Sequence, residues 1–173
     1  MQPFPFPDLR TERLRIADWR PELDLGDRQN LLVGDLKEIL TPAVLAPLPP
    51  SFAPSSDDQD LRRWLGDRAS EAGVATIRMI EEERVVGLVI LAEVETALWH
   101  LGYLLAEETW GQGFASEVLG ALTAAAASTG AVSLLAGVAR DNPASVRVLE
   151  KAGFAQVAGG TEGGDLLFRR DFD

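Results

Sequence analysis

One stretch of the chain constrains the fold more than any other, because it reads as a strand, a loop, a helix and a second strand. Leu98–Leu105 is predicted as a strand, and residues 113–128 carry apolar side chains at helical spacings of three and four. The apolar run at 131–139 reads as a strand buried on both faces. Two strands joined by a helix pair in parallel through a right-handed crossover, so this stretch predicts a β-α-β unit.

Shorter elements flank this unit. Upstream we predict a strand, a weakly patterned helical stretch, a Pro-rich loop and two strands that pair as a hairpin, at residues 11–16, 21–40, 41–54, 74–80 and 84–94. Between the loop and the hairpin, Ser56 and Gln59 form a capping box for a helix that ends near Gly73. Downstream, Asn142 and Pro143 open a helix, Gly153 ends it, and two further strands follow at 154–157 and 166–170.

The composition excludes several classes of function. The chain has 173 residues, 46% of them hydrophobic and 25% charged, which fits one globular domain and not a disordered segment. Its net charge of −11 repels a nucleic-acid backbone, so DNA and RNA are poor partners. It has no Cys and one His, which argues against disulfides, a thiol nucleophile and a metal site.

Neither a leader nor a membrane span is expected. The first seven residues lack the basic and apolar regions of a signal peptide, which makes the cytoplasm the default location. Residues 118–139 carry no charge over a length that could cross a bilayer. Ser128-Thr129-Gly130 interrupts them with residues typical of a helix end, so we expect a helix followed by a strand.

A glycine-containing loop precedes the helix of the β-α-β unit, with the sequence Trp110-Gly111-Gln112-Gly113-Phe114-Ala115-Ser116. A helix N-terminus presents free backbone N–H groups and a partial positive charge, which favour a phosphate. Gly113 leaves room for close approach. The loop lacks the Gly-Lys-Ser/Thr run of a Walker A motif, and it lies too far from the strand for a dinucleotide-binding turn. The alternative is an ordinary loop without a ligand.

A second motif follows the next strand, from Asn142-Pro143-Ala144-Ser145 to Lys151-Ala152-Gly153-Phe154. The two motifs together resemble the acetyl-CoA-binding core of the GNAT superfamily of N-acetyltransferases, most specifically over about residues 85–154. Thr11-Glu12-Arg13-Leu14 and the form of the glycine loop resemble its ribosomal-protein N-terminal (RimJ/RimL-like) branch. The resemblance implies a single α/β (α+β) domain over residues 1–173, with a mostly antiparallel sheet splayed at the β-α-β unit and helices on both faces.

The resemblance also implies how acetyl-CoA binds. The family pattern Gln/Arg-x-x-Gly-x-Gly/Ala falls on Trp110, Gly113 and Ala115, and Trp110 departs from it. The pyrophosphate would be held by backbone N–H groups of Gln112, Gly113, Phe114, Ala115 and Ser116. The pantetheine arm would enter the splay as an added strand along the backbone of Tyr103, Leu104 and Leu105. Asn142 would bond the same arm, cap the following helix, or do both.

Two residues are candidates for proton transfer. Many members of the superfamily carry a Tyr seven positions after the Asn to protonate the leaving thiolate, but this chain has Leu149 there. In the suggested branch a hydroxyl three positions after the Asn takes this role, which implies Ser145. His100 lies where some members place a catalytic Glu, and an imidazole suits proton removal at neutral pH. The alternatives are a polar residue in a first helical turn for Ser145 and an exposed strand residue for His100.

Other residues are weaker candidates. Three carboxylates could replace His100 as the base, although each is more typical of a surface: Glu93, Glu95 and Glu162. Three aromatic residues could line an acceptor pocket, although large apolar residues in predicted elements more often belong to the core: Trp19, Trp64 and Trp99.

We therefore expect an enzyme that transfers acetyl from acetyl-CoA to an amine, above all the N-terminal α-amine of a protein or peptide. One alternative is a small-molecule acceptor such as a polyamine or an aminoglycoside. A second is a non-catalytic acetyl-CoA-binding module, because the usual Tyr is absent. The C-terminal strands and their turn could support a homodimer, and no metal, nucleic-acid or membrane partner is expected.

Overall fold

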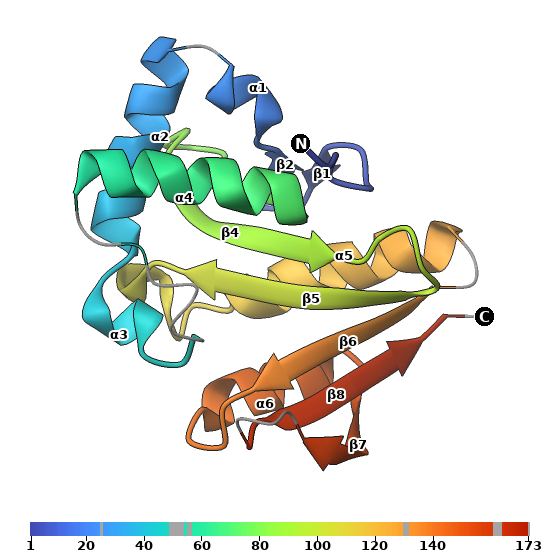
Figure 1. Ribbon diagram of the computed structural model, residues 1–173. Coiled ribbons are helices and arrows are strands. Elements are labelled where there is room, and N and C mark those ends of the chain that lie inside the picture. The colour runs from blue at the N-terminus through green and yellow to red at the C-terminus, as the bar shows by residue number, and fades with distance from the viewer. Residues whose placement is uncertain (25, 49–53, 55–56, 130–131, 161–163, 173) are drawn as a thin grey trace.

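The computed structural model describes every residue except 25, 49–53, 55–56, 130–131, 161–163 and 173. The described residues contain one eight-stranded sheet in the order β1-β2-β3-β4-β5-β6-β8-β7 (Figure 1). Its strands are β1 (Leu9–Arg10), β2 (Leu14–Asp18), β3 (Gly73–Met79), β4 (Val85–Ala92), β5 (Leu98–Leu105), β6 (Ser133–Val138), β7 (Ala155–Gly160) and β8 (Leu166–Asp171).

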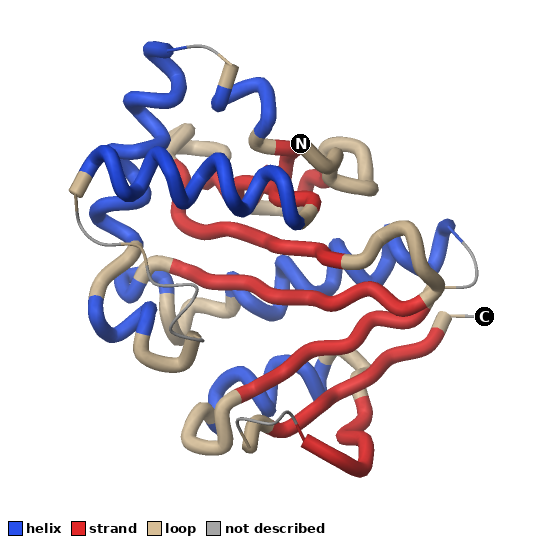
Figure 2. Tube along the Cα trace, viewed as in Figure 1, coloured by secondary structure: helices blue, strands red, loops and turns tan. Residues whose placement is uncertain are grey.

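Neighbouring strands run antiparallel throughout this sheet except for β5 and β6. These two are joined by α5 (Phe114–Thr129) and run parallel, so the predicted β-α-β unit is confirmed. Their register covers only the pairs Leu98↔Ser133, Trp99↔Leu134 and His100↔Leu135. Beyond the last pair the two strands diverge, as the lower strands of Figure 2 show. The sheet is therefore mostly antiparallel and splayed at its parallel pair.

Helices cover both faces of the sheet (Figure 1). On one face, α5 and α6 (Pro143–Lys151) share a core with the sheet, where Leu119 packs with Ile16 and Ile77. On the other face, α2 (Gly26–Ile39) and α4 (Asp58–Glu71) share a second core that includes Leu88. Two short helices, α1 (Arg20–Leu23) and α3 (Pro42–Leu45), flank α2 in the chain. The predicted fold class is confirmed.

Three of the tryptophans belong to these cores. Trp19 and Trp64 meet edge to face, with ring centroids 6.4 Å apart and ring planes at 85°. Trp99 packs against Phe6 at 5.6 Å between centroids. All three are at most 7% exposed. Their side chains therefore stabilise the fold, as large apolar residues in regular elements are expected to do.

The N-terminal elements are shorter than predicted. Residues 11–16 are predicted as one strand, but residues 11–13 form a tight turn after β1, and β2 begins only at Leu14. Thr11 N donates to Leu14 O and Leu14 N donates to Thr11 Oγ1, each at 2.9 Å. A Thr hydroxyl that bonds nearby backbone stabilises such a turn. The helical stretch predicted at 21–40 is likewise divided, into α1 and α2.

Two helix starts also differ from the prediction. The Pro-rich segment contains α3, which is capped by Thr41: its hydroxyl accepts from Val44 N at 3.4 Å. α4 is capped by Asp57, whose carboxylate accepts from Gln59 N at 2.7 Å. Ser56 of the predicted capping box lies outside the described residues. Asp performs the same task as Ser at an N-cap and adds a charge that the helix dipole favours.

The prediction that the second strand of the unit is buried on both faces is wrong. In β6, Leu134, Ala136 and Val138 are buried, whereas Leu135 is half-buried and Gly137 is exposed. The buried residues join the core of α5 and α6. The core of α2 and α4 includes no described residue of β6. The strand alternates because helices cover only one of its faces.

In the part of the chain that the structure describes, no helix combines the length and the apolar character needed to cross a membrane. The uncharged run at residues 118–139 is divided between α5 and β6, as the interruption at Ser128 and Thr129 predicts.

Asp18 ties the N-terminal segment to the sheet. Its carboxylate accepts from Phe4 N at 3.1 Å and from Arg20 N and Nε at 2.9 and 2.8 Å. Burial acts to raise the pKa of Asp18, but the hydrogen bonds from Arg20 and Phe4 outweigh it, so the pKa lies below 3.8. The ionised form is therefore stabilised by folding.

We predict that Asp18→Asn lowers the free energy of unfolding by about 1 kcal/mol at neutral pH. Because the folded-state pKa lies below the unfolded value of 3.8, this contribution is present above that value and is lost as the pH falls through the folded one. Urea unfolding of both proteins at about pH 7 and about pH 3 measures the difference. A difference that stays constant or grows on acidification would contradict the prediction.

Candidate functional site

A groove of about 680 Å³ opens where β5 and β6 diverge. It is lined by the C-terminal part of β5, the loop and first turn of α5, the N-terminal segment and exposed side of α6, and α3 with the residues after it. This volume lies within the range of ligand-binding sites. The groove therefore joins the two motifs of the sequence, which are separated in the chain by α5 and β6.

β5 forms one wall with main chain that lacks a second partner strand. Its residues Leu101 to Leu105 pair with β4, but the described pairing with β6 has ended at His100. Backbone groups that face the splay are therefore available to an added extended chain, as at the edge of a sheet. The three residues predicted to bind there all line the groove: Tyr103, Leu104 and Leu105.

The glycine loop closes one end of the groove. Gly111 and Gly113 have φ of 72° and 84°, a region that glycine adopts without steric cost. Glu117 N donates to Gly113 O at 3.0 Å, so N–H groups of the preceding turn have no acceptor within α5. Four of the predicted phosphate-binding residues line the groove: Gly113, Phe114, Ala115 and Ser116.

Gln112, the fifth predicted residue of the loop, does not line the groove. Its carbonyl accepts from Arg13, and its side-chain amide donates to Glu108 O. Trp110, where the family has a polar residue, is 51% exposed and lines the groove. Its Nε1 donates to Leu105 O at 2.9 Å. The indole thus ties the loop to the end of β5 and presents an aromatic surface to a ligand.

The first turn of α6 forms the opposite wall. Asn142 is the N-cap of this helix, and its Oδ1 accepts from Ser145 N at 3.1 Å. Pro143 follows in the first turn, so this predicted helix start is confirmed. Asn142 also lines the groove. Since Oδ1 is used by the cap, Nδ2 is the atom that can donate to a ligand.

A pair of hydroxyl groups spans the groove. The phenol of Tyr103 on β5 donates to Ser145 Oγ on α6 at 3.4 Å. Burial raises the pKa of Tyr103 more than the bond to Ser145 lowers it, so the phenol stays protonated at neutral pH. The sequence predicts a role for the side chain of Ser145, but it gives Tyr103 a role through its backbone alone. Strand alternation separates Leu101 and Tyr103 from His100 and is the signal that could have found this side chain, because Leu101 and Tyr103 both pack on the face of α5 and α6.

His100 lies on the other face of β5. Alternation groups it with Leu104, which packs in the core of α2 and α4. Its side chain is 48% exposed, and Nε2 is 3.6 Å from Glu93 Oε2. His100 occupies the last β5–β6 pair, at the vertex of the splay, and does not line the groove. The two predicted catalytic residues are therefore separated by the sheet.

The other predicted bases are at the surface or undescribed. Glu93 is exposed next to His100, and Glu95 is exposed in the same turn. Glu162 lies outside the described residues. Within the described ranges, His, Asp and Glu side chains form no group of three that could hold a metal ion.

Two further parts of the groove wall are absent from the sequence predictions. α3 packs at the end of β5, where Thr41 Oγ1 donates to Glu107 in the 3₁₀ helix Glu107–Thr109. Its signal was Thr41-Pro42, the same cap-and-proline signature as Asn142-Pro143. Arg147 and Lys151, four residues apart on α6, place two positive charges on the wall, against the one carboxylate of Asp141. In a chain of net charge −11, such a local excess favours an anionic ligand.

Comparisons with known proteins agree with this geometry. The family described as Acetyltransferase (GNAT) domain matches residues 13–155. No curated protein matches the chain. Among solved structures, a GNAT-family acetyltransferase from Bacillus anthracis has a TM-score of 0.76 and 16% identity, over 95% of this chain and 98% of that one.

Two other solved structures carry ribosomal-protein names. RimL, a ribosomal L7/L12 alpha-N-protein acetyltransferase in complex with coenzyme A, has a TM-score of 0.65 and 19% identity, over 96% of this chain and 99% of RimL. A Vibrio cholerae protein named as a candidate ribosomal-protein-serine acetyltransferase has a TM-score of 0.69 and 17% identity, over 98% and 99% of the two chains.

At these identities the structural similarity establishes the fold. Family membership rests on the match over residues 13–155, which includes β2 to β6, α5, α6 and both motifs of the groove. The chain is therefore a member of the GNAT family of N-acetyltransferases.

Proposed function

We propose that this protein transfers the acetyl group of acetyl-CoA to the N-terminal α-amine of a protein or peptide. The observation that carries the proposal is the hydrogen-bonded pair of Tyr103 and Ser145, set in a groove between a splayed strand and a helix N-terminus. This arrangement offers a proton donor, free main chain and an anion site in one cavity.

The groove has the chemistry that acetyl-CoA requires. The first turn of α5 and Gly113 suit a pyrophosphate, since they offer N–H groups without a side chain in the way. Arg147 and Lys151 add positive charge to the same groove. The open main chain of β5 and the Nδ2 of Asn142 suit the amides of pantetheine. The bound coenzyme supplies the acetyl group as a thioester.

The hydroxyl pair suits the departure of the thiolate. The amine nitrogen bonds to the thioester carbon, the C–S bond breaks, and the sulfur needs a proton. In our proposal Ser145 Oγ donates that proton while Tyr103 donates to Ser145, which supports the serine as it loses its hydrogen. Backbone N–H groups of β5 that face the splay stabilise the negative charge that develops on the carbonyl oxygen.

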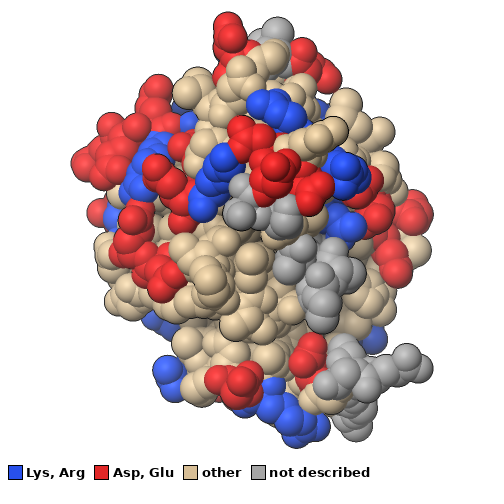
Figure 3. All heavy atoms as spheres, turned by 60° about the vertical axis from the view of Figure 1, so that its left-hand side comes forward, with Lys and Arg blue, Asp and Glu red and all other residues tan. Residues whose placement is uncertain are grey.

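The acceptor side favours a weakly basic amine. Deprotonating an α-amine at pH 7 costs about 1 kcal/mol, whereas a lysine-like amine costs about 4.6 kcal/mol. His100, exposed at the vertex of the splay, is the proposed base, and it can accept this proton directly or through water. Figure 3 shows Asp and Glu side chains, interspersed with Lys and Arg, mainly over the upper half of the side toward which the splay opens, and acidic side chains attract cationic acceptors. The name of RimL points to the same class of acceptor.

A non-catalytic acetyl-CoA-binding module is the second candidate. The observation that favours it is Leu149, which is fully buried where many family members have their acid Tyr. Turnover separates the two candidates, because only the enzyme produces acetylated amine.

The coenzyme site is tested by Gly113→Glu, which adds bulk and negative charge at a position of φ 84° on the groove wall. We predict that calorimetry finds acetyl-CoA binding in the wild type and a Kd at least about tenfold higher in the variant. A Cβ at this position would lie 3.6 Å from Arg13 Nη2, so the new side chain disturbs the loop and brings a negative charge next to the first turn of α5, where the phosphates are proposed to bind. Gly164→Glu is the matched control, because Gly164 has φ 86°, open space around it and no place in the groove wall.

An equal loss in Gly164→Glu would assign the effect to backbone strain or net charge. A wild-type protein that does not bind acetyl-CoA would contradict the proposed function itself.

The acid is tested by Ser145→Ala and Tyr103→Phe. We predict that Ser145→Ala lowers kcat by about tenfold to a hundredfold and that Tyr103→Phe lowers it less, with little change in acetyl-CoA affinity. Because Tyr103 acts through Ser145, the double variant should be no slower than Ser145→Ala. Ser128→Ala removes an exposed hydroxyl of α5 outside the groove wall and should retain activity. Unchanged kcat in Ser145→Ala, or additive losses in the double variant, would exclude this arrangement.

The acceptor class and the base are tested together. We predict that peptides with a free N-terminus are acetylated faster than N-blocked lysine peptides and faster than spermidine. His100→Ala should lower kcat by about tenfold to a hundredfold, since general base catalysis contributes this much. Glu81→Gln, an exposed change at a residue that does not line the groove, is the control. Turnover of spermidine alone would replace the N-terminal acceptor with a small-molecule one, and full activity of His100→Ala would remove His100 as the base.

A further inference from the structure

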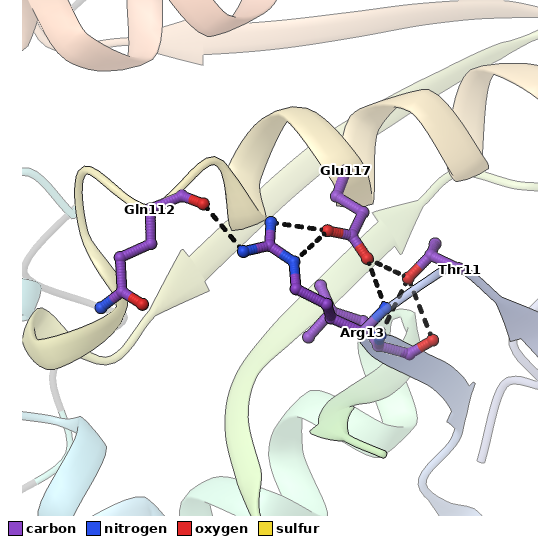
Figure 4. A network of polar contacts seen from close by, with 5 residues as sticks. Thr11, Arg13, Gln112 and Glu117 are labelled. Atoms are coloured by element: carbon purple, nitrogen blue, oxygen red, sulfur yellow. Dashed lines mark hydrogen bonds and ion pairs between the residues drawn. The ribbon is translucent and has the colours of Figure 1, made fainter. Parts of the chain in front are cut away.

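The Thr11-Glu12-Arg13-Leu14 motif lies outside the groove, because none of its residues lines it. The structure nevertheless places it against the loop that closes the groove (Figure 4). The turn between β1 and β2 brings Thr11 and Arg13 to the first turn of α5, where Arg13 meets Glu117 across 104 residues of chain. A motif at the start of the chain therefore contacts the phosphate end of the site.

Arg13 joins three parts of that loop. Its Nε donates to Glu117 Oε2 at 2.8 Å, and Nη2 lies 2.7 Å from the same oxygen. Its Nη1 donates to Gln112 O at 3.0 Å (Figure 4). Its guanidinium carbon lies 4.1 Å from the centre of the Phe114 ring. One side chain thus holds the residue before the loop glycine, the first residue of α5 and the first turn of that helix.

Glu117 anchors this arginine. Its Oε1 accepts from Arg13 N at 2.9 Å and from the Thr11 hydroxyl. Burial acts to raise the pKa of Glu117, but the hydrogen bonds from Thr11 and Arg13 outweigh it and lower the pKa, so the group is ionised at neutral pH. Its side chain is 16% exposed and that of Arg13 is 42% exposed. The carboxylate is therefore a fixed point between the β1–β2 turn and α5.

The bond from Arg13 to the Gln112 carbonyl sets the direction of the next N–H group. In a planar trans peptide, the C=O of Gln112 and the N–H of Gly113 point in opposite directions. No described peptide bond is cis. While Arg13 holds the carbonyl, the Gly113 N–H must point away from Arg13. Gly113 lines the groove and Arg13 does not, so this orientation suits an anion bound in the groove.

We infer that Arg13 is a positioning residue for the coenzyme: held by Glu117, it fixes the glycine loop so that the loop N–H groups meet the pyrophosphate of acetyl-CoA. The inference rests on the proposed function and extends the binding machinery to a residue outside the groove. Arg suits this task because its planar fork can bond a carboxylate and a carbonyl at once.

A role through charge alone makes a different prediction. If Arg13 only attracted the pyrophosphate, Glu117 would repel it, and Glu117→Gln would tighten binding. If Arg13 acts by position, Glu117→Gln weakens binding, because the arginine loses its anchor. The change in acetyl-CoA affinity caused by Glu117→Gln therefore has opposite signs under the two roles of Arg13.

The experiment compares Arg13→Gln and Glu117→Gln with Arg15→Gln. Arg15 is the matched control, because it lies two residues later, is 41% exposed and pairs with Asp8. Calorimetry measures the Kd of acetyl-CoA and of free adenosine diphosphate. We expect both test variants to raise both constants by a similar factor, about tenfold, since a charge-assisted hydrogen bond is lost. Arg15→Gln should leave both constants unchanged.

A second measurement separates positioning from a general loss of structure. Acetyl-pantetheine carries the thioester without the pyrophosphate, so its turnover should be the same in the wild type and in Arg13→Gln. If Arg13→Gln does not fold, as judged by circular dichroism, Arg13→Lys keeps the charge without the fork and should show the same pattern with a smaller factor.

Three outcomes would overturn the inference: tighter binding in Glu117→Gln, a loss for acetyl-CoA without a loss for adenosine diphosphate, or an equal loss of turnover with acetyl-pantetheine. Failure of the wild type to bind acetyl-CoA would instead overturn the proposed function, so the two failures are distinguishable.

Discussion

The parallel pairing of β5 and β6 ends after His100 and Leu135, and the groove exists because it ends there. Each strand keeps a partner on its outer side: β5 pairs with β4 through Leu105, and β6 pairs with β8 from Ser133 to Val138. The splay therefore gives up only one row of backbone hydrogen bonds. The backbone groups of that row are open to a partner that adds hydrogen bonds, as at the edge of a sheet.

The period of a β-strand explains how the proposed chemistry is divided. His100 and Tyr103 are three residues apart on β5, an odd interval, so their side chains lie on opposite faces of the sheet. Tyr103 meets Ser145 on the side of α5 and α6, while His100 is exposed on the side of α2 and α4. In the proposed reaction the acid then serves the leaving sulfur from one side of the sheet and the base takes the proton of the amine from the other, with the vertex of the splay between them.

The proposed phosphate end of the groove is held by contacts that reach across the fold. Trp110 ties the glycine loop to the end of β5, and Arg13 ties it to the β1–β2 turn. In a protein with a net charge of −11, an anionic coenzyme needs local compensation. Arg147 and Lys151 provide it on the groove wall, and the ionised Glu117 is paired with Arg13 next to the helix N-terminus.

The sequence by itself determined the elements and motifs whose signals are local. Hydrophobic period predicted the β-α-β unit, and the Asn142-Pro143 start and the Gly153 end of α6 follow from backbone chemistry within a few residues. The same kind of signal at Thr41-Pro42 was present but unused, and α3 was therefore missed. Burial on both faces of β6 was a wrong prediction, because local apolarity does not say which faces helices will cover.

Only the tertiary structure decided which side chains meet. Tyr103 and Ser145 lie 42 residues apart in the chain, and Arg13 and Glu117 lie 104 apart. Whether such residues touch depends on how whole elements pack and where a strand pair ends, and no period or cap within either segment carries that information. The residue types of the site could be read from the sequence, whereas the pairs they form arise from packing over the full length of the chain.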